Sequence, residues 1–180
     1  MAKFEINEFG EIIREDYFFS SVKENIAQLL PYDRKVWKVY LLSLFTLGIY
    51  GIVVAFAMAK ETNISCVDDG KHTRSFWPTL GLMIITFGIY GIVWYYNWLN
   101  REANYLESQG KDKRFTGAAY LGLFFLNIAI NIASTLLPDI SFVFSLLMIF
   151  VNILILTKII NQHNLVNKTY NTIYFGRKEQ

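Results

Sequence analysis

The charged residues of this 180-residue chain are confined to a few segments, and long uncharged apolar runs separate them. About 20 apolar residues of helix are needed to cross the hydrocarbon core of a bilayer. The helices of a soluble bundle would instead show polar stripes at helical spacing, and stretches such as Leu41–Phe45 show none. The sequence therefore predicts an all-α integral membrane protein with four transmembrane helices in two hairpins. The uncharged runs are residues 39–59, 75–100, 115–138 and 140–157.

Lys and Arg predict the orientation, because cytoplasmic loops of membrane proteins carry an excess of both. With four crossings, fourteen of these residues fall on the side of the termini and three fall on the other side, in loop 60–75. We therefore expect both termini in the cytoplasm. Four tryptophans stand near the ends of the first two runs, where aromatic side chains anchor a protein at the membrane surface. The expected interfacial anchors are Trp37, Trp77, Trp94 and Trp98.

The segment before the first run has the pattern of an amphipathic helix. Ser21 and Glu24 form a capping box, and apolar residues follow at helical spacing until Pro31. This helix would lie on the inner leaflet or dock a partner, or it would pack on the protein's own loops. The expected division is a cytoplasmic N-terminal segment, a four-helix transmembrane domain and a cytoplasmic tail. Their bounds are residues 1–35, 36–160 and 161–180.

The first half of the chain contains a tandem repeat with an offset of forty positions. The string Thr46–Val53 returns as Thr86–Val93, and Arg34 and Trp37 match residues 74 and 77 in the same register. Small residues one turn apart on a helix let two backbones approach closely in lipid. We interpret the repeated string as a helix-packing motif. Its members are Gly48, Tyr50, Gly51, Gly88, Tyr90 and Gly91.

The repeat allows two topologies. If each copy crosses once, the matching loops lie on opposite sides of the bilayer. If each copy bends at Gly-Ile-Tyr-Gly and returns, both loops stay in the cytoplasm. We expect crossing spans with a kink at the glycines, because the two arms of each copy are short for a deep hairpin. Lipid also tolerates irregular backbone only where protein or water covers it.

The repeated string resembles the mark of a bacterial family of small integral membrane proteins of unknown function, which carry Thr-Leu-Gly-Ile-Tyr-Gly-Ile-Tyr-Trp in a transmembrane segment. The resemblance extends to Asp69–Thr73 and Asn161–Asn171, and it covers residues 34–171. The first copy departs from the pattern, with Val54 in place of the tryptophan. The resemblance implies a multi-pass protein of the bacterial cytoplasmic membrane, and it implies no reaction, substrate or cofactor.

Polar side chains inside the third and fourth runs are amides and hydroxyls. The four runs contain no ionisable Asp, Glu, Lys, Arg or His, which argues against an ion-coupled pump. An interhelical hydrogen bond of about 0.6–2 kcal/mol is the expected role of the amides, and a polar conduit is the alternative. The intramembrane polar residues are Asn127, Asn131, Ser134 and Asn152.

Several classes of function are disfavoured by the residues themselves. A net charge of +2 is too small to indicate a nucleic-acid binder. Cys66 is alone, so neither a disulfide framework nor a multi-thiolate metal site is expected. His72 and His163 are isolated, and the chain has no metalloprotease, phosphate-loop or nucleophile-elbow string. We therefore expect no enzymatic activity, cofactor or metal.

The remaining hypothesis is a non-enzymatic membrane protein that acts through helix–helix association. It would be an accessory, assembly or immunity-type factor that binds other membrane proteins or a second copy of itself. An oligomeric pore or passive permeation path lined by Asn127, Asn131 and Asn152 is the alternative. A third hypothesis is anionic-lipid binding through the basic loop Lys111–Arg114.

Overall fold

The structure is a computed structural model that describes residues 4–6, 12–14, 28–112 and 115–176. A short antiparallel hairpin of β1 (Phe4–Ile6) and β2 (Ile12–Arg14) precedes the helices. Most of the expected amphipathic helix lies outside the described residues. Residues 28–35, which are described, form no helix.

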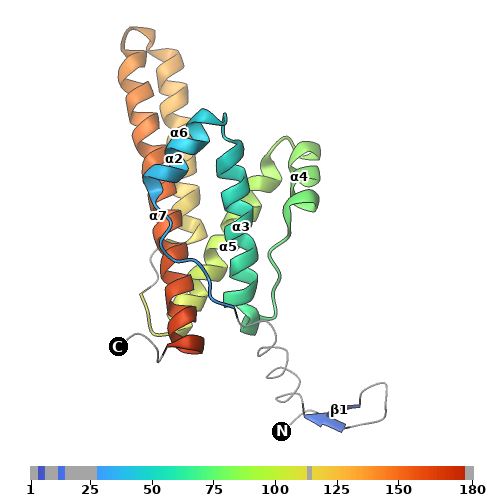
Figure 1. Ribbon diagram of the computed structural model, residues 1–180. Coiled ribbons are helices and arrows are strands. Elements are labelled where there is room, and N and C mark those ends of the chain that lie inside the picture. Colours follow the sequence, from blue (N-terminus) through green and yellow to red (C-terminus); the bar gives the residue numbers. More distant parts are fainter. Residues whose placement is uncertain (1–3, 7–11, 15–27, 113–114, 177–180) are drawn as a thin grey trace.

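The rest of the described chain consists of three helical hairpins whose tips point the same way (Figure 1). The third hairpin extends beyond the other two (Figure 1). The first hairpin is α2 (Val36–Phe45) and α3 (Ile49–Ser65), and the second is α4 (Phe76–Ile85) and α5 (Ile89–Ser108). The third is α6 (Gly117–Leu136) and α7 (Ser141–Phe175), joined by the 3-10 helix η2 (Pro138–Ile140). A second 3-10 helix, η1 (Val67–Asp69), follows α3.

The first two uncharged runs do not form the expected spans with a kink at the glycines. Helices α2 and α4 each end after ten residues, and the chain then turns back on itself. The turns place Leu47 at φ 51° with Gly48 at φ 91°, and Phe87 at φ 50° with Gly88 at φ 88°. Two helices, α6 and α7, are long and apolar enough to cross a membrane, whereas α2 and α4 are shorter apolar helices.

Both turns satisfy their backbone groups with the same local hydrogen bonds. Thr46 Oγ1 accepts the Tyr50 N–H at 2.9 Å and donates to a carbonyl of the preceding helix at 2.7 Å. Thr86 Oγ1 makes the matching bonds to Tyr90 and to its own preceding helix, at 2.9 and 2.7 Å. The glycine in the left-handed region then ends the first helix, which is the common role of glycine at a helix C-terminus. Because the turns leave few backbone groups unpaired, they suit an apolar environment.

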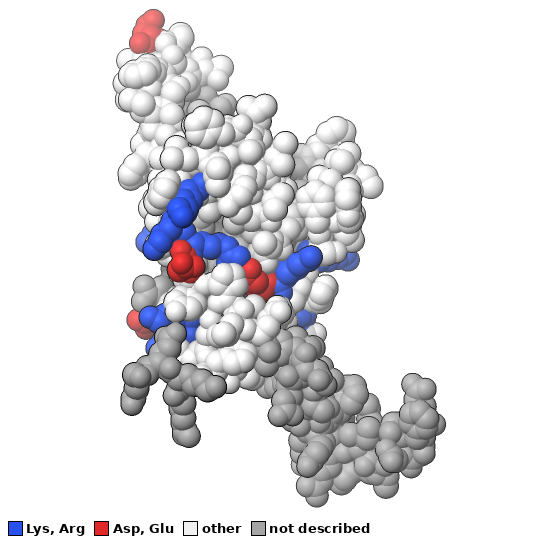
Figure 2. Space-filling model, viewed as in Figure 1, with Lys and Arg blue, Asp and Glu red and all other residues white. Residues whose placement is uncertain are grey.

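The buried core lies in the half of the molecule away from the hairpin tips. Two clusters of buried apolar side chains fill the space between α3, α5 and α7, one around Trp98 and Ile160 and one around Leu106 and Val166. Charged side chains form a belt across the middle of the visible face, and the region between this belt and the tip of the third hairpin is uncharged (Figure 2).

Candidate functional site: a buried carboxylate–histidine network

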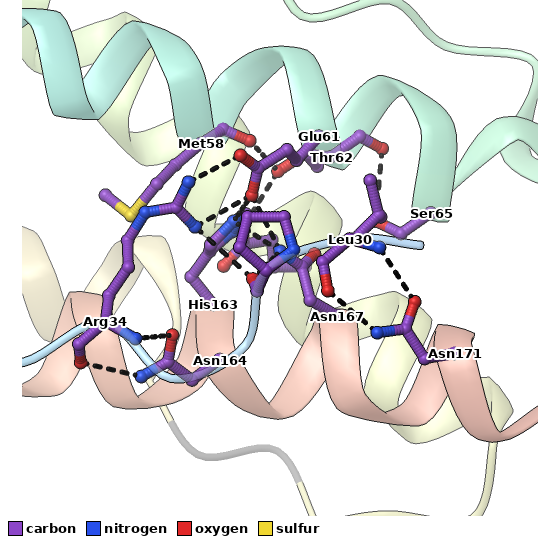
Figure 3. A network of polar contacts seen from close by, with 12 residues as sticks. Leu30, Arg34, Met58, Glu61, Thr62, Ser65, His163, Asn164, Asn167 and Asn171 are labelled. Atoms are coloured by element: carbon purple, nitrogen blue, oxygen red, sulfur yellow. Dashed lines mark hydrogen bonds and ion pairs between the residues drawn. The ribbon is translucent and has the colours of Figure 1, made fainter. Parts of the chain in front are cut away.

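The centre of the site is His163 on α7, which lies between one carboxylate of α3 and one of α5. Its Nδ1 lies 2.6 Å from Oε1 of Glu102, and its Nε2 lies 2.9 Å from Oε2 of Glu61. Two ionised carboxylates can only accept hydrogen bonds, so with both of them charged the two ring nitrogens each carry a proton. In that state His163 is an imidazolium ion between the two carboxylates. Figure 3 shows His163 beside Glu61.

Glu102 is held by further donors from two helices. Its Oε1 accepts hydrogen bonds from Thr62 Oγ1 at 2.8 Å and from Trp98 Nε1 at 3.0 Å. Its Oε2 is buried without a hydrogen-bond partner in the part of the chain that the structure describes. A charged group that is this deeply buried is stable only with an opposite charge beside it, which His163 supplies.

Glu61 joins the network to the segment before α2. Arg34 donates to both oxygens of Glu61, at 2.8 Å from Nη1 to Oε2 and through Nη2 to Oε1. Arg34, Glu61, His163 and Glu102 therefore form a neutral set of two cations and two anions. All four lie outside the uncharged runs.

The environment shifts two pKa values in this set. Burial raises the pKa of the Glu61 carboxyl, but the hydrogen bond from His163 and the Arg34 guanidinium outweigh burial and bring it to about 2. Burial lowers the pKa of His163, but the charge of Glu102 and its hydrogen bonds to both carboxylates raise it above its ordinary value. Both shifts favour the charged forms of these two groups.

Three asparagines on one face of α7 hold the extended segment 28–35. Asn171 accepts from the Leu30 N–H at 3.0 Å and donates to the Leu30 carbonyl at 2.7 Å. Asn164 makes the same pair of bonds with the backbone of Arg34, at 3.2 and 3.0 Å. Between them, Asn167 donates to the carbonyl of Pro31 at 2.7 Å and also to Glu61 (Figure 3). The amides therefore serve this segment as a neighbouring β-strand would, and they place Arg34 beside Glu61.

A second buried cation, Arg101 on α5, organises the loop between α3 and α4. Its guanidinium binds both oxygens of Asp69, at 2.6 and 2.9 Å. Its remaining N–H groups reach side chains of Asn63 and Thr73 and backbone carbonyls of the loop. Its hydrogen-bonding capacity is thereby used within the protein.

Neither polar site was predicted from the sequence. Glu61, Glu102 and His163 come from three helices, and His163 is 102 and 61 positions away from its two partners. The one local signal was the spacing of Asn164, Asn167 and Asn171, which places three amides on one helical face.

The structure separates the glycines of the repeated string into two roles. Gly48 and Gly88 lie in the turns, where a Cβ would meet nothing within 4 Å. Gly51 and Gly91 face their own hairpins, where a Cβ would lie 2.9 Å from Ser43 Oγ and 3.0 Å from Met83 Cε. The expectation that each glycine pair shares one helical face is therefore wrong, because the first glycine of each pair precedes the helix. Tyr50 and Tyr90 pack partly buried against the core.

The intramembrane polar residues lie between α6 and α7 or on their surface. Asn127 donates to Asn152 Oδ1 at 3.3 Å across the hairpin. Asn131 is exposed, and its nearest hydrogen-bond acceptor is the sulfur of Met148 at 3.9 Å. Ser134 is half-buried one turn further along α6.

The four tryptophans divide into two pairs. Trp37 and Trp77 stand in the first turns of α2 and α4 with 60% and 77% of their surface exposed. Trp94 and Trp98 are buried in the core, where Trp98 donates to Thr62 as well as to Glu102. The expectation that all four anchor the protein at the membrane surface is therefore wrong for Trp94 and Trp98.

Metal or thiol chemistry has little support in the described ranges 28–112 and 115–176. No group of three or more His, Cys, Asp or Glu side chains that could hold a metal ion is found there. Cys66 is buried, and burial raises the pKa of its thiol to about 12. At that pKa the thiol stays in the unreactive protonated form.

Comparison with known proteins gives a family but no characterised relative. Neither a curated protein nor a solved structure shows significant similarity to the chain. A family model described as a domain of unknown function (DUF4234) matches residues 34–76 and residues 74–168. The first match contains Arg34 and Glu61, and the second contains Glu102 and His163. Because these matches extend over well more than half of its length, the chain belongs to the DUF4234 family.

Proposed function

We propose that this protein is embedded in the bacterial cytoplasmic membrane by all three hairpins, of which α6/α7 alone crosses the bilayer. Ten helical residues are about 15 Å long, so α2 and α4 would reach about halfway into a hydrocarbon core of about 30 Å. Leu47 and Phe87 at the tips are 95% and 97% exposed, and lipid would cover them. The polar bundle of α3, α5 and α7 would remain at the membrane surface and in water.

The distribution of charge supports this topology. All 17 Lys and Arg residues lie outside the uncharged runs, and the hairpin tips point the same way. With the tips in the membrane, every Lys and Arg would therefore lie on one side of the bilayer. On the far side, the link between α6 and α7 would carry Asp139 as its one charged residue. Because cytoplasmic segments carry an excess of Lys and Arg, this distribution supports a cytoplasmic location of both termini.

Within the membrane, the proposed activity is non-enzymatic association with other membrane proteins or with a second copy of the chain, as an accessory, assembly or immunity-type factor. The observation that carries this proposal is Asn131, an exposed amide five residues before the end of α6 at Leu136. An amide that faces lipid loses the hydrogen bonds of water, and a polar group on a neighbouring helix restores them. The association surface is therefore on α6, and the glycines of the repeat serve folding.

A photoreactive residue at Ile128 in the native membrane tests this proposal. The wild-type chain should give a crosslinked product of defined mass on irradiation, and Asn131→Leu should remove at least half of it. Thr135→Val is the matched control, because the Thr135 hydroxyl already donates to a carbonyl of its own helix at 3.1 Å. A product that Asn131→Leu leaves unchanged, or no product at all, would contradict association through this surface.

An oligomeric pore is the second candidate. It has less support, because Asn127 and Asn152 bind each other within one chain and leave mainly Asn131 for a polar lining. Planar-bilayer recordings that show conductance altered by Asn131→Leu would favour the pore over association alone.

A further inference from the structure

A cleft of about 640 Å³ lies between the segment before α4 and the adjoining face of α5. No carboxylate is among the side chains that line it. The lining instead contains three basic side chains from one wall, and three amides at helical spacing together with Arg101 from the other. These residues are Lys71, His72 and Arg74, with Asn97, Asn100 and Asn104.

Two basic side chains of this cleft, Lys71 and Arg74, are free to bind an anion, whereas Arg101 is bound by Asp69. Lys71 and Arg74 are exposed, and neither forms an ion pair with a residue in the described part of the chain. The Arg74 guanidinium lies 5.9 Å from the ring centroid of Tyr90. Such a cation–π contact orients the guanidinium without neutralising it. Asn97 and Asn104 are also exposed and make no side-chain hydrogen bond within the same residues.

The repeat explains why this cleft is cationic. Arg34 and Arg74 occupy matching positions of the two copies, and Arg34 is neutralised by Glu61. At the same offset, the residue that matches Glu61 is Arg101, so the second copy has a cation where the first has the carboxylate partner. Arg74 therefore lacks the partner that its counterpart has. The larger cleft of about 760 Å³ beside Arg34 differs, because Asp33 also lines it.

The cleft opens at the level where the apolar surface begins. Helix α4 begins at Phe76, two residues after Arg74, and the exposed side chains beyond it are apolar, among them Trp77. On the α5 wall, the exposed Val93 lies one helical turn before Asn97, on the side of the hairpin tip. A ligand in this cleft would therefore have its charge against Lys71 and Arg74 and its apolar part along α4 and α5.

We propose that this cleft binds the phosphate headgroup of an anionic phospholipid. Lys71 and Arg74 would bind the phosphate, the free amides would bind its oxygens and the glycerol, and the acyl chains would lie along the apolar surface of the second hairpin. The inference rests on the membrane location proposed above, and it does not depend on association through Asn131.

Native mass spectrometry of the detergent-purified full chain, equilibrated with equal amounts of phosphatidylglycerol and phosphatidylcholine, tests this site. The wild type should retain one phosphatidylglycerol in preference to phosphatidylcholine. Each basic residue near a membrane surface contributes about 1 kcal/mol to the attraction of anionic lipid, so Lys71→Gln/Arg74→Gln should lower the affinity for phosphatidylglycerol about thirtyfold. The control Lys38→Gln/Lys60→Gln removes the same charge from residues outside the cleft and should lower it less than twofold.

Three results would overturn the proposal. Equal losses in both double variants would mean that the lipid responds to the whole basic belt. Displacement of the lipid by millimolar inorganic phosphate would mean that the cleft is a site for soluble phosphate. Equal retention of the two lipids by the wild type would mean that the cleft does not select charge. Circular dichroism of both variants checks that they are folded, and the crosslink from Ile128 tests association separately.

Discussion

Nδ1 of His163 lies 2.6 Å from Oε1 of Glu102, and both side chains are fully buried, although 61 residues separate them in the chain. If one of these two buried groups is charged, the other must carry the opposite charge, because either charge alone would be uncompensated away from water. The contact therefore ties the stability of the α5–α7 packing to the protonation of one ring.

We predict that His163→Leu destabilises the protein. The substitution leaves Arg34 as the only cation beside Glu61 and leaves Glu102 buried without a cation. Loss of one partner of a buried pair lowers the free energy of unfolding by about 3–5 kcal/mol. Denaturant unfolding of purified protein in a mild detergent, followed by helical circular dichroism, measures this. His72→Leu is the control, because His72 is exposed. Equal stability of the wild type and His163→Leu would show that the pair is not charged.

The same pair predicts a decline of stability on the alkaline side. The folded-state pKa of His163 lies above its ordinary value, so its stabilisation is complete below about pH 6.5 and is lost as the pH rises through the folded pKa. Glu61 has a pKa of about 2, so its stabilisation is present above about pH 4.5 and is lost as the pH falls toward 2. The melting temperature should therefore change little between pH 5 and 6.5 and fall at higher pH. In His163→Gln the alkaline decline should be absent, and an unchanged profile in that variant would assign the decline to another group.

The asparagine clamp predicts a local change that can be separated from global stability. Asn171→Ala leaves the buried N–H and carbonyl of Leu30 without partners. Loss of these two hydrogen bonds should lower the stability of the docked segment by about 1–3 kcal/mol and release the segment before α2. Hydrogen exchange in residues 28–35 should speed up at least tenfold, while that of α5 stays the same. Asn161→Ala changes an exposed asparagine of the same helix and should have no such effect. Unchanged exchange in Asn171→Ala would mean that the clamp is not formed in solution.

Replacement of glycine by alanine should have opposite effects on stability in the turn of the second hairpin and inside the helix that precedes it. Gly88 has a φ of 88°. Gly88→Ala therefore forces a Cβ into the left-handed region, which should destabilise the fold by about 1–2 kcal/mol. Gly81 lies inside α4 with open space around its Cα. Gly81→Ala should be neutral or stabilise by about 0.5–1 kcal/mol.

Unfolding free energies in detergent compare the two glycine variants. Similar values would indicate that residues 86–88 continue the helix.

The proposed topology predicts which positions a membrane-impermeant maleimide reaches in intact cells. In a Cys66→Ala background, Asp139→Cys should be labelled from outside, and His72→Cys should be labelled only after lysis. Leu47→Cys should be protected in both conditions, because lipid would cover it. Labelling of His72→Cys from outside would instead support four crossings.

The positions of the helices could be predicted from the sequence better than their paths. Each of the four uncharged runs contains helix, because apolar side chains without charges favour that structure in lipid. The reversal at Leu47 and Phe87 was the less favoured of the two topologies. Two glycines three residues apart fit a helix-packing face as well as a turn, so the repeated string did not decide between them. The decisive signal was Thr46, whose hydroxyl supplies the acceptor that the turn needs.

The candidate site depends on contacts between distant parts of the chain, which no short sequence pattern predicts. His163 has no ionisable partner within its own helical turn, so its pairing with Glu61 and Glu102 follows only from the packing of three helices. The positions of Trp94 and Trp98 were predicted wrongly for a different reason. An aromatic residue at the end of an apolar run fits a membrane surface as well as a buried core. Their burial follows from contacts with other helices, because Trp94 packs against Phe56 of α3 and Trp98 against His163 of α7.

The clamp on Leu30 also sets an order of events during synthesis. Its partner Asn171 follows it by 141 positions, so the extended segment stays without its hydrogen bonds until α7 has been synthesised. The three hairpins form from contacts that are close in sequence, whereas closing so long a loop is slow and costs entropy. Residues 28–35 are therefore synthesised before the three hairpins and fixed after them.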